Sequence, residues 1–132
     1  MSRYVYYQPN EKDIKDEYGD CAIRALTKAM GMSWIEVFDE LCRYARYYQC
    51  LPNQKPATHS FMEDSGWHYT SIPKGKRITV EDFAKSHKGK YNLHVRVGYN
   101  THFVAVVDGK YYDTWDSGKK LLYGYWSKEE GV

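Results

Sequence analysis

The chain has 132 residues and a formal net charge of +2, from 19 Lys and Arg against 17 Asp and Glu. This length fits one domain, residues 1–132, that buries enough surface to fold without metal or disulfide staples. The charge balance excludes the strongly basic footprint of a general nucleic-acid binder. The aromatic content of 17%, including 14 Tyr, excludes a disordered chain.

The sequence carries no signal for a membrane or for secretion. No apolar run approaches the length of a transmembrane helix, and residues 1–7 hold no apolar signal-peptide core. Three cysteines, Cys21, Cys42 and Cys50, form no Cys-x-x-Cys pair and share no metal-ligand spacing with a histidine. We therefore expect reduced thiols in a cytoplasm, with no membrane or nucleic acid as partner and no metal.

The first half of the chain is predicted to be mainly helical, after a short strand near Arg3–Tyr7 and a polar loop. Asp20 is the expected N-cap of the first helix, Gly31 lies just past its end, and Ser33 with Glu36 forms a capping-box pattern. Four helices are expected where apolar residues recur every three or four positions: Cys21–Met30, Trp34 to about Tyr48, about His59–Asp64 and about Val80–Ser86.

After residue 87 the apolar period changes to two, which predicts strands. The expected strands are Tyr91–Val97, His102–Val107, Lys110–Trp115 and Leu121–Trp126. Asp108-Gly109 between two apolar runs is typical of a two-residue hairpin loop. Helices followed by antiparallel strands predict an α+β fold, with the N-terminal helices packed on a C-terminal antiparallel sheet.

The hairpin register brings a histidine and a carboxylate together. A two-residue loop places Val104 opposite Asp113 and His102 opposite Trp115, and these side chains share one face. His102 and Asp113 are then diagonal neighbours with Cβ atoms about 7 Å apart, within reach of a hydrogen bond. Asp116 points to the other face, so a regular hairpin excludes it as the partner of His102.

Cys21 follows Gly19-Asp20 and begins the first helix. The unpaired backbone N–H groups and the dipole of a helix N-terminus favour a thiolate, which is the nucleophilic form of cysteine. The amide of Cys21 is also a ready donor to the oxyanion of an acyl-transfer intermediate. With His102 as base and Asp113 as its orienting partner, the three residues follow the logic of a nucleophile–base–orienter triad.

Gly19-Asp20-Cys21, a strand histidine and Asp113-Thr114-Trp115 occur in that order along the chain. This pattern resembles the papain-like superfamily of cysteine peptidases, especially its small bacterial and phage-type members. The likeness covers about residues 8–45 and 90–126. It implies a papain-like fold and a thiol hydrolase without a cofactor. It also implies catalytic roles for Cys21, His102 and Asp113, with Asp20 and Trp115 as supporting residues; the tryptophan shields the hydrogen bond between histidine and orienter.

One position departs from the family pattern. The residue six positions before the cysteine, usually an amide that helps to hold the oxyanion, is Lys15 here. Asn10 and Gln8 are the nearest amide side chains, and either reaches the site if the segment between them and Cys21 loops out. We expect Asn10 in preference to Gln8, and a small or shallow substrate cleft because the chain is short.

Two other functions remain open. The second helix carries Arg43 and Arg46 interleaved with tyrosines, a composition that suits a protein partner. The chain is then a non-catalytic binding protein that engages a host protein or defence factor, in the host cytoplasm if a phage encodes it. Alternatively, the same triad transfers the acyl group to an amine, as in transglutaminase-like relatives. If the chain is a thiol hydrolase, its expected partner is a protein or peptide substrate.

Overall fold

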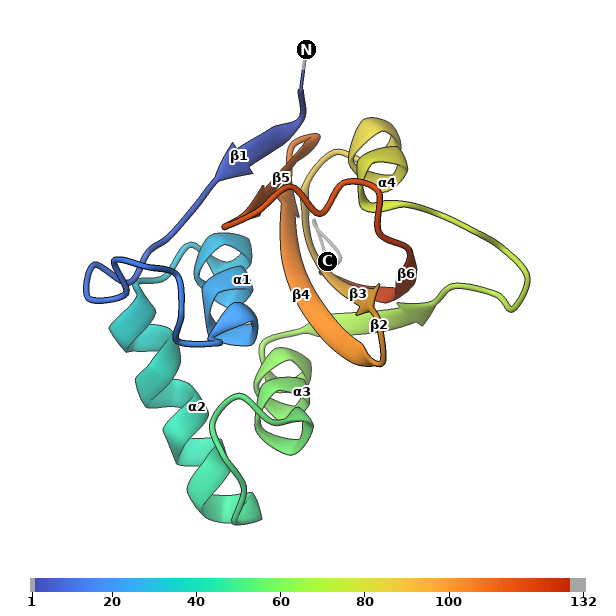
Figure 1. Cartoon of the computed structure of the whole chain (residues 1–132). Helices are drawn as coiled ribbons and strands as arrows, with labels where there is room; N and C mark the ends of the chain where they lie inside the picture. The colour runs from blue at the N-terminus through green and yellow to red at the C-terminus, as the bar shows by residue number, and fades with distance from the viewer. Residues whose placement is uncertain (1, 129–132) are drawn as a thin grey trace.

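The protein has an α+β fold in which helices flank one sheet (Figure 1). The computed structural model describes residues 2–128. Its helices are α1 (Cys21–Met30), α2 (Trp34–Tyr48), α3 (Lys55–Asp64) and α4 (Val80–Ser86). Its strands are β1 (Tyr4–Tyr6), β2 (Trp67–Ser71), β3 (Lys90–Val97), β4 (Asn100–Val107), β5 (Lys110–Asp113) and β6 (Leu122–Lys128).

The helices begin where the sequence supplies caps. At the start of α2 the Ser33 hydroxyl accepts from the Glu36 amide, and the Glu36 carboxylate accepts from the Ser33 amide, so the predicted capping box is confirmed. At the start of α4 the Thr79 hydroxyl accepts from the amide of Asp82. Gly31 ends α1 in the left-handed conformation, at φ 68°, as its position predicts.

The sheet has the strand order β1-β5-β4-β3-β6-β2. All neighbouring strands are antiparallel except β1 and β5, which run parallel. The register of the β4–β5 hairpin pairs Val107 with Lys110 and Ala105 with Tyr112, which confirms the predicted two-residue loop. The Cys-bearing helix α1 packs mainly against β4, so the nucleophile candidate and the histidine strand are neighbours.

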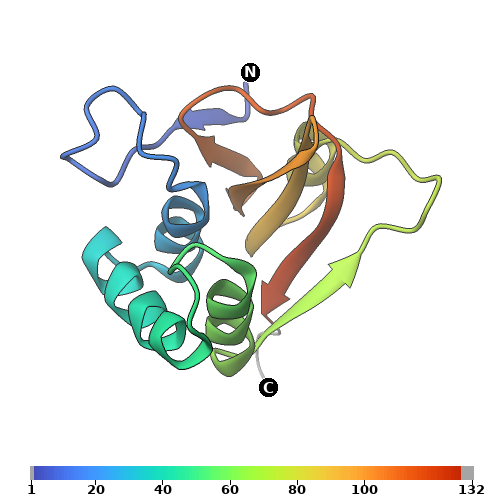
Figure 2. The same cartoon turned by 60° about the horizontal axis from the view of Figure 1, so that its bottom comes forward.

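The two faces of β4 belong to two separate parts of the core. Phe103 and Ala105 pack in the cluster formed with α1, α2 and α3. Val104 and Val106 pack in the cluster formed with α4. Figures 1 and 2 show the corresponding layers, with α1, α2 and α3 gathered on one side of the sheet and α4 on the other. This alternation is the period of two that the sequence predicts for the strand.

Four predicted features differ in the structure. The strand predicted over Lys110–Trp115 ends at Asp113. The third helix begins at Lys55 rather than near His59, because Pro56 is accommodated in its first turn. The strand Trp67–Ser71 was not expected. Asp20 occupies the N-cap position of α1, but its side chain makes no capping hydrogen bond there. Among the described residues, no helix has both the length and the apolar character needed to cross a membrane.

Candidate active site

His102 and Asp113 meet at the ends of two neighbouring strands. His102 is the third residue of β4, and Asp113 is the last residue of β5. His102 Nε2 lies 2.7 Å from Asp113 Oδ2, so the predicted contact is confirmed. Because Nε2 is the nitrogen that faces the carboxylate, Nδ1 is the ring nitrogen left to face a reacting group.

The Asp113 carboxylate is completely buried and is held on both oxygens. Oδ2 accepts from the Ser117 hydroxyl at 2.8 Å as well as facing His102. Oδ1 accepts from the Thr114 amide at 2.8 Å and from Arg24 Nη2 at 3.1 Å. A buried carboxylate with this many donors has one fixed orientation, which in turn fixes the plane and tautomer of the imidazole.

Cys21 is the first residue of α1, and its partly buried thiol lies next to His102, whose imidazole lowers the pKa of the thiol. The backbone of Phe103 acts on that pKa in the same direction. The site therefore forms where the N-terminus of α1 meets the beginning of β4. Two segments that lie about 80 residues apart in the sequence supply the thiol and the imidazole, and the sequence alone gave no contact between them.

The local environment shifts the pKa values of both groups toward an ion pair. Burial alone would raise the pKa of the Cys21 thiol, but the hydrogen bond and charge of His102, the Phe103 amide and the charge of Arg24 outweigh it and lower that pKa. Burial alone would lower the pKa of His102, but its hydrogen bonds to Asp113 and Cys21 and the charges of both raise the pKa to about 9. These shifts favour a thiolate beside an imidazolium.

The first turn of α1 keeps its backbone N–H groups available. The Asp20 side chain is held elsewhere, with Oδ1 accepting from Arg24 Nη1 at 3.1 Å and Oδ2 accepting from Trp34 Nε1 at 2.8 Å. Because this carboxylate does not cap the helix, the amide of Cys21 is not blocked by it. These two contacts hold Asp20, the residue directly before Cys21, in one orientation.

Arg24 is the site residue that the sequence reasoning missed. Its side chain is only 6% exposed and bridges Asp20 and Asp113. The one available signal was a charged residue inside a helix whose neighbouring positions, Ile23 and Ala25, are apolar. That signal does not reveal which carboxylates the arginine contacts, because Asp113 lies 89 residues further along the chain.

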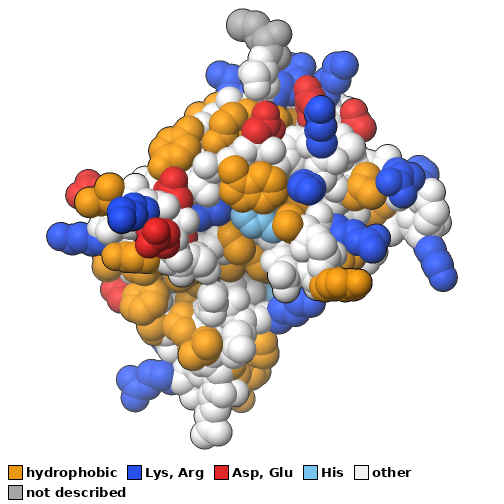
Figure 3. All heavy atoms as spheres, viewed as in Figure 1, with side chains coloured by type: hydrophobic (Ala, Val, Ile, Leu, Met, Phe, Trp, Pro, Cys, Tyr) orange, Lys and Arg blue, Asp and Glu red, His pale blue; other side chains and the backbone are white. Residues whose placement is uncertain are grey.

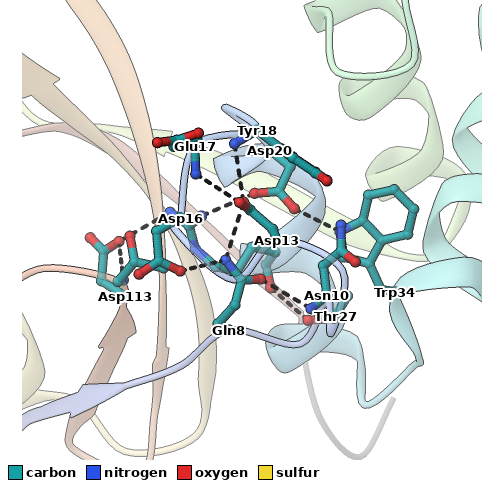
Figure 4. A network of polar contacts seen from close by, with 12 residues as sticks. Gln8, Asn10, Asp13, Asp16, Glu17, Tyr18, Asp20, Thr27, Trp34 and Asp113 are labelled. Carbon is teal, nitrogen blue, oxygen red and sulfur yellow. Dashed lines mark hydrogen bonds and ion pairs between the residues drawn. The ribbon is translucent and has the colours of Figure 1, made fainter.

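The segment of residues 8–18, which holds the two oxyanion candidates, is organised around a buried carboxylate. Asp13 is 2% exposed and accepts from the backbone amides of Glu17 at 2.7 Å and Tyr18 at 3.0 Å (Figure 4). Gln8 uses both ends of its amide within the segment, donating to Asp16 at 2.9 Å and accepting from the Asn10 amide at 3.0 Å. Figure 4 shows these side chains converging on one another.

The segment does loop out between Asn10 and Cys21, as the oxyanion hypothesis requires. The Asn10 side-chain oxygen accepts from the Lys12 amide at 3.0 Å. None of the hydrogen bonds described for Gln8 or Asn10 involves Cys21. An oxyanion role therefore stays a prediction for either side-chain amide, as it does for the backbone amide of Cys21.

The ring of Trp115 lies beside that of His102, although β5 ends at Asp113 and its pairing with β4 does not extend to Trp115. Its ring centroid lies 5.1 Å from that of His102, with the planes tilted by 34°. Trp115 is 37% exposed, so part of its ring faces solvent while the rest packs beside His102. Asp116 accepts from the Tyr111 hydroxyl and from the Gly118 amide. It lies beyond the end of β5 at Asp113, so strand alternation does not determine which way it points.

The other cysteines and histidines lie outside this arrangement. Cys42 and Cys50 are free thiols. His59 and His94 pack at tilted and edge-on angles in an aromatic cluster with Trp126, whose Nε1 donates to His94 at 3.0 Å. Burial together with the charge of His59 lowers the pKa of His94 to about 3. Within residues 2–128 no group of three or more His, Cys, Asp or Glu is arranged to hold a metal ion.

Comparison with models of known families, with curated proteins and with solved structures finds no match to this chain.

Proposed function

We propose that this protein is a thiol hydrolase of papain-like type that cleaves a peptide, isopeptide or related amide bond. The observation that carries the proposal is the 2.7 Å contact between His102 and the buried carboxylate of Asp113, beside which the Cys21 thiol lies within range of the imidazole. The order of these residues along the chain also matches the papain-like pattern. A reduced thiol suits the expected cytoplasmic location.

The first half-reaction uses the ion pair. The Cys21 thiolate attacks the carbonyl carbon, a C–S bond forms, and the carbonyl electron pair moves to oxygen. The backbone N–H groups of the first turn of α1 hold this oxyanion. As the tetrahedral intermediate collapses, the C–N bond breaks, and the leaving amine takes its proton from the imidazolium of His102. The product is a thioester on Cys21.

The second half-reaction restores the thiol. Neutral His102 takes a proton from water, and the resulting hydroxide attacks the thioester carbon. The C–S bond breaks, and the thiolate leaves beside the imidazolium. Asp113 stays ionised throughout; it holds the imidazole plane and stabilises its positive charge. No step requires a cofactor.

The direct test is turnover of a peptide library made from a bacterial cytosolic extract, with new N-termini read by mass spectrometry. Wild type and Cys42→Ala, the matched cysteine control, should generate new termini. Cys21→Ala should generate none while remaining folded, because it lacks only the nucleophile. New termini in equal number from Cys21→Ala would refute the hydrolase. Added amine in the same assay distinguishes hydrolysis from acyl transfer, which adds the mass of the amine to the product.

A non-catalytic binding function is the second candidate, and the surface of α2 favours it. Tyr47 is 81% exposed and packs edge-on against Tyr48, with ring centroids 4.9 Å apart. Arg43 and Tyr44 line the same hollow, and Asp64 closes it. Aromatic and arginine side chains together are typical of protein-binding surfaces. In this case Tyr47→Ala should abolish capture of the partner while Cys21→Ala has no effect.

A further inference from the structure

Arg24 connects the two sides of the candidate site through one guanidinium. Nη1 contacts Asp20, the residue directly before Cys21, and Nη2 contacts Asp113, the partner of His102. Both distances are 3.1 Å, and all three side chains are buried. Arg24 lies three positions after Cys21, so both residues lie on the same side of α1.

Stability alone is a weak reason for an arginine at this position. Removing a guanidinium and two carboxylates from water carries a large desolvation penalty, and well-packed apolar residues often replace buried ion pairs without loss. The neighbouring positions of α1 are apolar and buried, so an apolar side chain suits the surroundings. The contacts of Arg24 instead single out the two carboxylates that border the thiol and the imidazole.

We propose that Arg24 is a positioning residue: its planar fork holds Asp113 by Oδ1 so that Oδ2 faces His102, and it ties the start of α1 to the end of β5. This inference rests on the proposed function. A lysine offers one point of charge and no fixed fork, so it cannot hold both carboxylates in the same geometry.

The positive charge of Arg24 also favours the thiolate form of Cys21. With Cys21 as thiolate and His102 as imidazolium, the pair is neutral, and the two carboxylates of Asp20 and Asp113 leave two negative charges. Arg24 compensates one of them. Its removal increases the negative charge around the sulfur, which disfavours the thiolate.

The test is the pH profile of Cys21 alkylation by iodoacetamide in the full chain, read by peptide mass spectrometry. Arg24→Met removes the charge and the fork, and Arg24→Lys keeps the charge only. Lys28→Met is the matched control, since Lys28 lies one turn further along α1 and packs over the Tyr112 ring, 4.3 Å from its centroid. We expect Arg24→Met to slow alkylation below neutral pH about tenfold, Arg24→Lys to fall between it and wild type, and Lys28→Met to match wild type.

Three results would overturn the role of Arg24. One is a folded Arg24→Met protein with the wild-type profile; another is Arg24→Lys indistinguishable from wild type, which also decides the question if Arg24→Met does not fold. The third is an equal loss in Lys28→Met. If wild-type Cys21 itself reacts as an ordinary thiol, the hydrolase proposal fails instead, so the two failures are distinguishable.

A second observation, independent of Arg24, concerns a basic hollow of about 670 Å³ near the beginning of β4. No acidic side chain lines this hollow. Four exposed cations do: Arg77, Arg96, Lys119 and Lys120. None of the ion pairs found among residues 2–128 involves these four. Figure 3 shows Lys and Arg side chains along the right-hand edge of the molecule in that view.

The hollow lies close to the candidate site along the chain. Gly98 and Tyr99 in its wall precede His102 by four and three residues, a distance of at most about 13 Å in extended backbone. Lys119 follows Trp115 by four residues. From the charge complementarity we infer that the hollow binds acidic residues of the substrate, so that the hydrolase acts on acidic protein segments. This inference also rests on the proposed function.

Binding is tested with the Cys21→Ala protein, so that it does not depend on turnover. Fluorescence anisotropy compares a short Glu-rich peptide, a Gln-rich peptide of the same length and a single-stranded oligonucleotide. Lys119→Gln/Lys120→Gln should weaken binding of the Glu-rich peptide about threefold to tenfold. The control Lys85→Gln/Lys88→Gln, which removes two exposed cations that line neither the hollow nor the candidate site, should not weaken it. The Glu-rich peptide should also slow alkylation of Cys21 in the wild type.

Equal binding of the two peptides, or equal loss in the control variant, would overturn the acidic-substrate inference. Peptide binding that leaves Cys21 alkylation unchanged would show that the hollow is not part of the substrate site. Tighter binding of the oligonucleotide would assign the hollow to nucleic acid.

Discussion

Replacing Asp113 perturbs the most heavily bonded side chain of the candidate site. Its buried carboxylate has four partners within 3.1 Å: His102, Ser117, Arg24 and the Thr114 amide. Asp113→Ala removes the acceptor for all four. Arg24 then keeps only its ion pair with Asp20, and part of its charge is left buried without a partner.

The size of the effect follows from these contacts. Hydrogen bonds to a charged group are worth about 1.5–3 kcal/mol each, so a simple sum over four bonds overshoots any measured loss. Removing one partner of a buried ion pair typically costs about 3–5 kcal/mol. We expect Asp113→Ala to lower the free energy of unfolding by about 4 kcal/mol. Asp113→Asn has the same shape and keeps one acceptor oxygen, so we expect about half of that loss.

Urea denaturation at neutral pH, followed by tryptophan fluorescence, measures these losses. Ser117→Ala is the matched control because it removes one of the four bonds and leaves the carboxylate in place; we expect a loss of about 1.5–2 kcal/mol. An Asp113→Ala protein whose free energy of unfolding lies within about 1 kcal/mol of wild type would refute the reasoning, because removing one partner of a buried ion pair should cost more than that. Equal losses for Asp113→Ala and Ser117→Ala would refute it as well.

Three further predictions address other parts of the network. In Cys21→Ala, Asp113 still raises the pKa of His102. The contribution of His102 to the free energy of unfolding should therefore be complete below about pH 6.5 and fall by about 1–3 kcal/mol as the pH rises through the folded-state pKa, measured by urea titration at several pH values. In wild type the lowered pKa of Cys21 has the opposite effect, so the dependence of stability on pH should be weaker. Trp34→Phe loses the donor to Asp20, so the free energy of unfolding in the same titration should fall by about 1.5–3 kcal/mol. An unchanged free energy of unfolding would contradict a structural role for that bond. Asp13→Ala leaves two backbone amides without their acceptor and should open residues 8–18 to limited proteolysis, with about 2 kcal/mol lost; an unchanged cleavage pattern would contradict this account of the segment.

Local signals predicted the elements that build the site. The helix Cys21–Met30 follows from an apolar stripe that ends at Gly31, and its observed bounds match. The hairpin loop at Asp108-Gly109 fixes the register between β4 and β5, because Asp108 and Gly109 both adopt the positive φ that such a turn requires. With that register, alternation alone is sufficient to bring His102 and Asp113 together.

Contacts between distant segments could not be predicted in this way. The strand Trp67–Ser71 exposes all but its first residue, so it shows no apolar period; its pairing with β6 provides its place in the sheet. The parallel pairing of β1 with β5 joins residues more than 100 positions apart in the sequence, such as Tyr4 and Tyr111. The side chain of Asp20 was expected to cap α1, but Arg24 and Trp34 compete for it and hold it away from the helix.

The pH dependence of Cys21 alkylation by iodoacetamide tests the central claim most directly, with Cys42 and Cys50 in the same chain as internal controls. If the thiol is paired with His102, Cys21 should react fast well below pH 8, and His102→Ala should slow it. Cys42 and Cys50 should follow an ordinary thiol with a midpoint near about 8.5. If Cys21 follows the same ordinary curve and His102→Ala leaves it unchanged, no activated nucleophile exists and the hydrolase account is wrong.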